Sequence, residues 1–159
     1  VNDSTEVHVL RFFNVYGPGQ GTDSNYAAVI PTFVEKIISG QSPTIFGDGS
    51  QSRDFVEVSD VVGLILQILA DENDVLNDVY NVATQTETSI LELLQLISKS
   101  VKEIDPSIPI PKVNYQGKRR GDIDISLANI AKVKSAFNWQ PKHSIEAGIA
   151  SLVAYELGS

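Results

Sequence analysis

The sequence predicts an α/β protein in which at least some strands pair in parallel. Segments rich in β-branched and aromatic residues, such as Val7–Phe13 and Val79–Val82, alternate with segments whose apolar residues recur at helical spacing. Such alternation is typical of strand–helix–strand units, whose strands run parallel. The 159 residues, 42% of them hydrophobic, suffice for one compact domain with its own core.

In the first half of the chain, short strands and helices follow one another closely. The expected elements are a strand at Val7–Phe13, a helix at Ala28–Ser39, short strands at Thr44–Phe46 and Arg53–Val58, and a helix to about Ala70. The glycines of GPGQG end the first strand, and Gly40 ends the first helix. Ser59 or Asp60 is expected to cap the second helix.

The second half continues this pattern. The expected elements are a strand at Val79–Val82, a helix from Ile90 to about Val101, an edge strand at Val113–Gln116, and helices at about Leu127–Phe137 and about Ile145–Leu157. Ser89 and Glu92 have the spacing of a capping box, which predicts where the first of these helices begins.

Two of the strands, at about 6–14 and 78–83, are apolar enough to lie at the centre of a parallel sheet, which needs neighbours on both sides. The other strands are short and are expected to form a separate small mixed α/β lobe. The sequence also contains no Met and starts at Val1, almost directly before a strand. These observations predict a part of a larger sheet.

The composition excludes several classes of partner. Twenty acidic residues against twelve basic ones give a net charge of −8, whereas nucleic acids and anionic membranes require basic surfaces. The chain has no Cys, and His8 and His143 lie in unlike contexts, so no metal site is expected. No apolar run approaches the about 20 residues of a membrane span. With no signal peptide in view, a cytoplasmic location is expected.

Asn14 is the first candidate binding residue, because it follows an apolar strand directly. Open α/β sheets bind ligands beyond the carboxyl ends of their strands, and the amide offers donors and an acceptor for a phosphate or a sugar hydroxyl. The residues alone favour the simpler alternative, in which this amide only hydrogen-bonds the adjacent turn.

Arg53 is the second candidate, in the segment Ile45–Asp60. The glycine-rich turn GDGSQ allows the backbone to approach a ligand closely, and a guanidinium at the start of the next strand is suited to bidentate contacts with a pyrophosphate. The alternative is a surface ion pair between Arg53 and Asp54 beside a hairpin turn, which would contribute little to stability.

The basic segment KRRGD, Lys118–Asp122, is the third candidate. Asp122 is suited to accept hydrogen bonds from ribose hydroxyls, or it only balances the neighbouring arginines. A solvated basic loop is an equally good interpretation of the whole segment. Trp139 and His8 are expected to be structural. No motif of covalent or acid–base catalysis, metal cluster or P-loop is present, so no catalytic residue is expected in this chain.

Four segments, in this order, resemble the C-terminal half of extended short-chain dehydrogenases, the NAD-dependent nucleotide-sugar epimerase/dehydratase family, with a particular likeness to UDP-glucose 4-epimerase-like members. They are LRFFNVYGPGQ, PTIFGDGSQSRDFVEVSDVV, VYNVATQTETSILELL and KRRGDIDISLANIAKVKSAFNWQPKHSIEAGI. The resemblance implies that residues 1–159 are a C-terminal substrate-binding region with interleaved Rossmann strands, and that the N-terminal NAD-binding region is absent.

The resemblance also implies roles for individual residues. The implied substrate-binding residues are Asn14, Val29, Thr44, Phe46, Arg53, Ile90, Arg119, Asp122 and Ser126, and Phe12 and Phe13 would lie near the nicotinamide of NAD. Arg53 and Arg119 would clamp the diphosphate, with Asp122 near the ribose. Thr44 and Phe46 would lie beside the base. Val29 would form a wall of the pocket, and Ile90 would pack close to the nucleotide. Ser126 matches a position that varies with substrate size, where a small side chain resembles members that admit N-acetylhexosamines.

The family's glycine fingerprint and its Tyr-x-x-x-Lys pair do not occur in this sequence. The resemblance implies a full-length parent, a homodimer, in which a tyrosinate removes a sugar-ring proton while a hydride at C4 passes to NAD. The ketose intermediate would rotate and take the hydride back on its other face. This chain alone is expected to be inactive. The alternatives are a dehydratase or decarboxylase of the same family, or a noncatalytic nucleotide-sugar-binding module.

Overall fold

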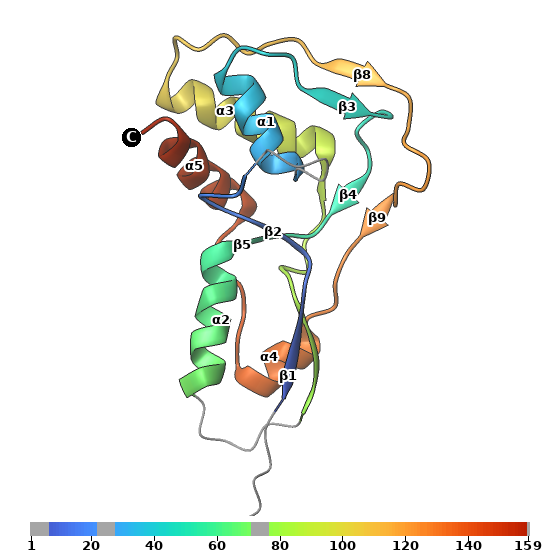
Figure 1. Cartoon of the computed structure of the whole chain (residues 1–159), viewed down its shortest axis with the longest axis vertical. Coiled ribbons are helices and arrows are strands. Elements are labelled where there is room, and N and C mark those ends of the chain that lie inside the picture. Colours follow the sequence, from blue (N-terminus) through green and yellow to red (C-terminus); the bar gives the residue numbers. More distant parts are fainter. Residues whose placement is uncertain (1–6, 22–27, 71–76, 159) are drawn as a thin grey trace, which may run out of the picture.

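The computed structural model describes residues 7–21, 28–70 and 77–158. The helices are α1 (Val29–Ile38), α2 (Val58–Ala70), α3 (Ile90–Ile104), α4 (Ala131–Phe137) and α5 (Ile145–Glu156). The strands are β1 (His8–Phe12), β2 (Asn14–Tyr16), β3 (Thr44–Phe46), β4 (Ser52–Arg53), β5 (Phe55–Glu57), β6 (Asp78–Val82), β7 (Thr88–Ser89), β8 (Asn114–Gln116) and β9 (Ile125–Ser126). Their arrangement is elongated, with one hydrophobic core toward each end (Figure 1).

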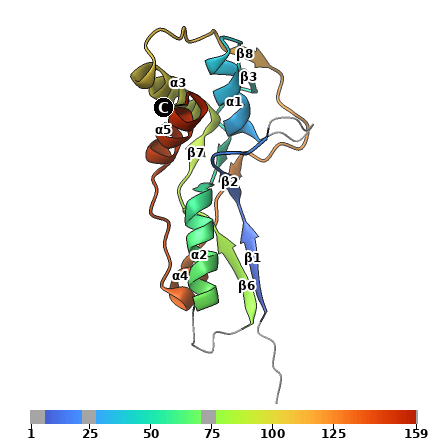
Figure 2. The same cartoon turned by 60° about the vertical axis from the view of Figure 1, so that its left-hand side comes forward.

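One end, the strand–helix part, consists of β1, β6, α2 and α4. The strands β1 and β6 pair in parallel, with Leu10 opposite Tyr80, which confirms the predicted parallel pairing. Residue 6, the first of the expected strand, lies outside the described residues. Both helices cover the same face of this pair (Figure 2), where Tyr80 and Val82 are buried. On the other face Val9 is 50% exposed, so only one face of β1 and β6 is covered by described residues.

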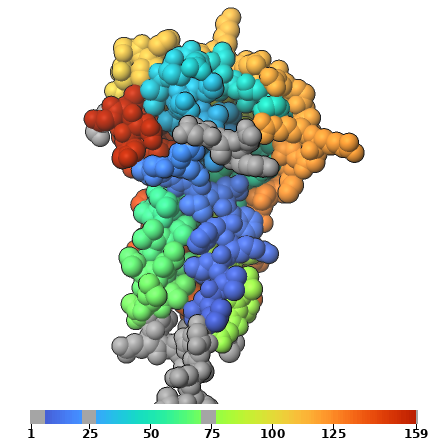
Figure 3. All heavy atoms as spheres, in the orientation of Figure 1, coloured from blue at the N-terminus to red at the C-terminus, as the bar shows by residue number. Residues whose placement is uncertain are grey.

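The other end, the small lobe, consists of α1, α3 and α5 with the parallel pair β3 and β8. The space-filling view shows the chain around β8, in orange, directly beside α1 and β3 (Figure 3). Ser89 caps α3, since its hydroxyl accepts a hydrogen bond from the Glu92 amide at 3.1 Å, as the capping-box spacing predicted. The observed ends of α1 and α5 lie within one residue of their predicted ends.

Between the two parts lies the waist, the region of β2, β4 and β5. Here β2 pairs in parallel with β5, and β4 lies between β7 and β9. The expected strand Arg53–Val58 is therefore two short strands in different sheets, separated by the fully buried Asp54. Asn14 was expected beyond the end of its strand, but it is the first residue of β2.

Two predicted helix starts were wrong, and in both cases a residue near the expected start makes contacts with a distant segment instead. Helix α2 begins at Val58, where Glu57 accepts a hydrogen bond from the Ser59 amide. The carboxylate of Asp60 instead accepts from the amides of residues 142 and 143. Helix α4 begins at Ala131 rather than about Leu127, because residues 125–126 form β9 against β4.

Candidate functional site

A cavity of about 240 Å³ opens between the small lobe and the waist. Its lining residues come from β2, α1, β3, the turn before β4, β4 itself, α3 and the loop before β9, and they are Asn14, Val29, Thr32, Phe33, Thr44, Phe46, Gln51, Arg53, Ile90, Arg119 and Asp122. Eight of the nine predicted substrate-binding residues are among them. The cavity is smaller than the about 300–1,000 Å³ of typical small-molecule sites, so it has room for only part of a ligand of that class.

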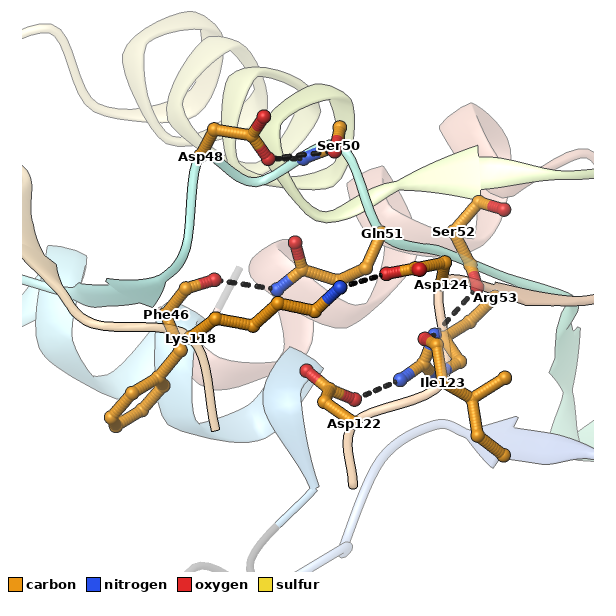
Figure 4. Close-up of polar contacts among 10 residues, drawn as sticks. All are labelled: Phe46, Asp48, Ser50, Gln51, Ser52, Arg53, Lys118, Asp122, Ile123 and Asp124. Carbon is orange, nitrogen blue, oxygen red and sulfur yellow. Dashed lines mark hydrogen bonds and ion pairs between the residues drawn. The ribbon is translucent and has the colours of Figure 1, made fainter. Parts of the chain in front are cut away.

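Arg53 holds one wall of the cavity through contacts with the chain near β9 (Figure 4). Its guanidinium lies 2.5 Å from the Asp122 carboxylate and donates to the Ile123 carbonyl at 2.7 Å. A third hydrogen bond, at 2.8 Å, goes to the carbonyl of Ser52. The alternative of a surface pair with Asp54 is therefore wrong, since Asp54 is buried and the partner is Asp122. The alternative in which Asp122 balances an arginine agrees with this contact.

Arg119 lies against an aromatic ring at another wall of the same cavity. Its guanidinium carbon is 3.8 Å from the centre of the Phe46 ring, within the range of a cation–π contact. Phe46 is itself held by Gln51, whose side-chain amide donates to the Phe46 carbonyl at 2.8 Å (Figure 4). Two guanidinium groups that are far apart in sequence thus lie at one cavity.

The Asn14 amide both supports the backbone and lines the cavity. Its nitrogen donates to the Asp54 carbonyl at 3.0 Å, which agrees with the simpler interpretation of a structural Asn. That contact uses one of the two donors of the amide. The position in the cavity lining also fits the interpretation as a binding residue, so the two roles are compatible.

The turn GDGS brings the backbone close to the start of α3. Gly49 has a φ of +82°, and a side chain there would meet the Cβ of Leu91 at 3.2 Å, so this position requires glycine. Asp48 accepts hydrogen bonds from the amide and hydroxyl of Ser50 (Figure 4). These bonds hold the pKa of the Asp48 carboxyl below its ordinary value.

Three predicted residues lie outside the cavity lining. Ser126 lies in β9, opposite Arg53 of β4. Phe12, at the carboxyl end of β1, is 47% exposed. Phe13 is partly buried against the core of the strand–helix part, with the Arg11 guanidinium 5.9 Å from its ring centre.

Three lining residues were not predicted: Thr32, Phe33 and Gln51. Thr32 and Phe33 follow Val29 by three and four positions in α1, so helical spacing places all three on one face. That spacing could have identified them. Gln51 sits in an irregular turn, where no periodic signal exists.

Other kinds of site have no support in the described ranges. No group of His, Cys, Asp and Glu side chains there is arranged to hold a metal ion. None of the helices that the structure describes combines the length and apolar character required for a membrane crossing.

Residues 2–83 match the model of the NAD dependent epimerase/dehydratase family. This match covers more than half of the 159 residues. The chain therefore belongs to the NAD-dependent epimerase/dehydratase family.

Individual relatives agree with this assignment. The chain is 35% identical over 148 residues to a putative UDP-glucose 4-epimerase of Methanocaldococcus jannaschii, covering 93% of this chain and 45% of that protein. It is 32% identical to UDP-glucuronic acid decarboxylase 1 of Arabidopsis thaliana, covering 94% of this chain and 32% of the relative. The chain thus spans less than half the length of these curated relatives.

A solved structure shows the same fold. UDP-N-acetylglucosamine 4-epimerase from Methanobrevibacter ruminantium, in complex with UDP-N-acetylmuramic acid, superposes with a TM-score of 0.83 at 34% sequence identity. The superposition covers 96% of this chain and 46% of the other. The predicted α/β class with Rossmann-type strands is thereby confirmed.

Proposed function

We propose that this chain is the substrate-binding part of an NAD-dependent nucleotide-sugar 4-epimerase, acting on UDP-glucose and UDP-galactose or their N-acetyl forms. One observation carries the proposal: Arg53 and Arg119, from distant segments, line one cavity together with Asn14. Guanidinium groups match the geometry and charge of a diphosphate, which explains how an acidic chain with a net charge of −8 could bind an anion.

The diphosphate is proposed to bind between the two guanidinium groups. The Arg53 guanidinium is paired with Asp122, so a phosphate must share this guanidinium with the carboxylate or displace it. Charge-assisted hydrogen bonds to a phosphate are stronger than neutral ones, and phosphate oxygens offer more acceptors than the carboxylate. Binding would then free Asp122 to accept from the ribose hydroxyls.

The rest of the nucleotide sugar is assigned by the shape and chemistry of the remaining lining. The base is proposed to lie beside Thr44 and Phe46, where an aromatic ring favours stacking. Val29 of α1 and Ile90 of α3 supply apolar walls. Ser126, which lies in β9 outside the cavity lining, is proposed to leave space for an N-acetyl group because its side chain is small.

This chain is proposed to contact the nicotinamide end of the cofactor rather than its phosphates. The exposed Phe12 ends β1, two residues before Asn14, and with Phe13 it is proposed to border the nicotinamide. No glycine fingerprint for the pyrophosphate occurs in this sequence. When bound, NAD supplies reversible hydride acceptance at the sugar C4.

The residues of this chain are proposed to bind and orient the substrate rather than to make or break bonds. Fixing the diphosphate positions the sugar for reaction and contributes to catalysis through orientation. We accordingly expect the 159 residues alone to be inactive, with the chemistry requiring a full-length parent. That parent is proposed to be a cytoplasmic homodimer.

A decarboxylase or dehydratase of the same family is the second candidate, favoured by the similarity to the Arabidopsis decarboxylase. The experiment is to incubate the purified parent with UDP-glucose, UDP-N-acetylglucosamine and UDP-glucuronic acid and to identify the products by NMR. Epimers at C4 are expected. Release of CO₂, or loss of water from the sugar, would overturn the epimerase proposal.

A noncatalytic module is the third candidate, and the reading frame upstream of residue 1 separates it from an enzyme. A glycine fingerprint followed by Tyr-x-x-x-Lys is expected there.

The proposed role of Ser126 is tested by the rate at which the parent enzyme converts UDP-N-acetylglucosamine. Complete exclusion of the acetamido sugar would contradict the role assigned to Ser126.

A further inference from the structure

Asp54 is a buried carboxylate that holds several segments of the waist together. Its side chain is completely shielded from solvent yet accepts four hydrogen bonds. The donors are the Thr84 amide at 2.8 Å, the Thr84 hydroxyl at 2.7 Å, the Gln85 amide at 2.9 Å and the Ala128 amide at 3.2 Å. A buried carboxylate is tolerated only when its acceptor capacity is satisfied in this way.

These donors come from two segments that are distant in sequence. Thr84 and Gln85 follow β6, the second strand of the strand–helix part. Ala128 follows β9, which pairs with β4 and continues the loop that carries Arg119 and Asp122. The carboxylate therefore connects the strand–helix part to a wall of the cavity.

The main chain of Asp54 reaches a third segment. Its carbonyl accepts the side-chain amide of Asn14 at 3.0 Å and the main-chain amide of Asn14 at 3.2 Å. Because Arg53 precedes Asp54 directly, a shift of Asp54 would move both Asn14 and Arg53. These are two of the residues on which the proposed diphosphate and sugar contacts depend.

The conformation of Gln85 depends on the same carboxylate. Gln85 has a φ of +59°, in the left-handed region that is unfavourable for residues other than glycine. Its amide donates to Asp54, and its side-chain oxygen accepts from the Ile130 amide at 3.4 Å. The carboxylate thus stabilises a backbone conformation that the chain would otherwise avoid.

We infer that Asp54 is a positioning residue of the nucleotide site, which fixes Asn14 and the Arg53 wall through its hydrogen bonds without lining the cavity itself. This inference rests on the proposed function. A second buried carboxylate, Asp60, offers a matched comparison. Comparing variants of the two residues distinguishes a role of Asp54 in the geometry of the site from a role in stability alone.

Asp60 is 4% exposed and accepts from the main-chain amides of Lys142 and His143 at 3.1 Å and contacts the His143 ring at 3.0 Å. It lies outside the cavity lining. The experiment compares Asp54→Asn with Asp60→Asn in the 159-residue chain. Each change substitutes a donating NH₂ group for an oxygen that accepts from main-chain amides, so both variants are expected to lose stability.

Calorimetric titration with UDP, at a temperature where both variants are folded, is the first readout. Asp54→Asn should weaken UDP binding by about tenfold or more, and Asp60→Asn should leave it within about twofold of the wild type. If the wild type binds UDP, equal affinities for the two variants would overturn the inference. If Asp54→Asn does not fold, Thr84→Val, which removes only the hydroxyl donor, should weaken UDP binding in the same direction, and unchanged binding by Thr84→Val would overturn it.

A ligand-free readout separates this inference from the proposed function. The NMR signals of the Asn14 side-chain amide and the Arg53 side chain should shift in Asp54→Asn or Thr84→Val and stay in place in Asp60→Asn. If the wild type does not bind UDP but these signals shift, the proposed function fails and the positioning role stands. If UDP binds and the signals do not move, the positioning role fails alone.

Discussion

The guanidinium of Arg53 and the carboxylate of Asp122 are 2.5 Å apart, although 69 residues separate them in sequence. Both side chains are about one-fifth exposed, at 19% and 20%, so the pair is neither fully solvated nor fully buried. The carboxylate occupies the position beside the guanidinium where the phosphate is proposed to bind. Under the proposed function, Asp122 would compete with the phosphate for this guanidinium and bind the ribose once displaced.

Removing the negative charge of Asp122 should raise the affinity for a ligand that has phosphates but no ribose. We expect Asp122→Asn to raise the affinity for inorganic pyrophosphate by about two- to fivefold, because the Arg53 guanidinium no longer has a paired carboxylate. Titration calorimetry at low ionic strength measures this. Asp124→Asn is the control, since Asp124 pairs with Lys118 on the same loop and is 74% exposed. Equal effects of the two variants would contradict the competition.

The Phe46 ring is expected to contribute to the affinity for the base of the nucleotide and much less to the affinity for its phosphates. The change Phe46→Leu removes the ring beneath Arg119 and the proposed stacking surface. We expect UDP to bind about fivefold more weakly, a loss of about 1 kcal/mol. Pyrophosphate, which has no base, serves as the control ligand and should lose less. An equal loss for both ligands would show that Phe46 only positions Arg119.

Gly148 in α5 should tolerate no side chain. A methyl group there would overlap the buried hydroxyl of Tyr16, so Gly148→Ala should lower the free energy of unfolding by about 1–3 kcal/mol. Gly63→Ala in α2 is the control: nothing lies within 4 Å of that position, and alanine should stabilise the helix by up to about 1 kcal/mol. Chemical denaturation measures both. Adding Tyr16→Phe to Gly148→Ala should recover part of the loss, and no recovery would contradict the proposed overlap.

Tyr16 should also make stability depend on alkaline pH. Burial, followed by the charges of Glu57, Asp60 and Glu146, raises the pKa of Tyr16 above its ordinary 10.0. The folded state therefore prefers the neutral phenol, and this contribution is complete below pH 10.0 and is lost as pH rises above it. Urea denaturation should show that the wild type loses up to about 1.4 kcal/mol more per pH unit above pH 10 than Tyr16→Phe does. Parallel pH curves for the two proteins would exclude this role.

The sequence predicts those parts of the fold that local contacts determine. Helix α3 begins where Ser89 can cap it, and α1 ends beside Gly40, both within reach of a few residues. The start of α4 was wrong because residues 125–126 pair with β4 and Ala128 donates to Asp54. Contacts between residues more than 70 positions apart cannot be recognised from the periodicity of the sequence.

The site could be predicted only in outline from the residues. Asn14 was a candidate binding residue because it follows an apolar strand, and Arg53 and the KRRGD loop were candidates because of their charge. The spacing of these segments in the sequence cannot show that they meet in the structure. The family resemblance supplied that convergence, and the structure brings eight of the nine residues to one cavity. Their role in binding stays a prediction. Gln51 was missed because its contribution is one hydrogen bond from an irregular turn.

The most direct test of the central claim is the titration of the 159-residue chain with UDP, repeated with the Arg53→Ala, Arg119→Ala double variant. If the two guanidinium groups bind one diphosphate, the wild type should bind UDP and the double variant should lose about 100-fold or more in affinity, since charge-assisted hydrogen bonds contribute about 1.5–3 kcal/mol each. The same affinity for both proteins would contradict the claim.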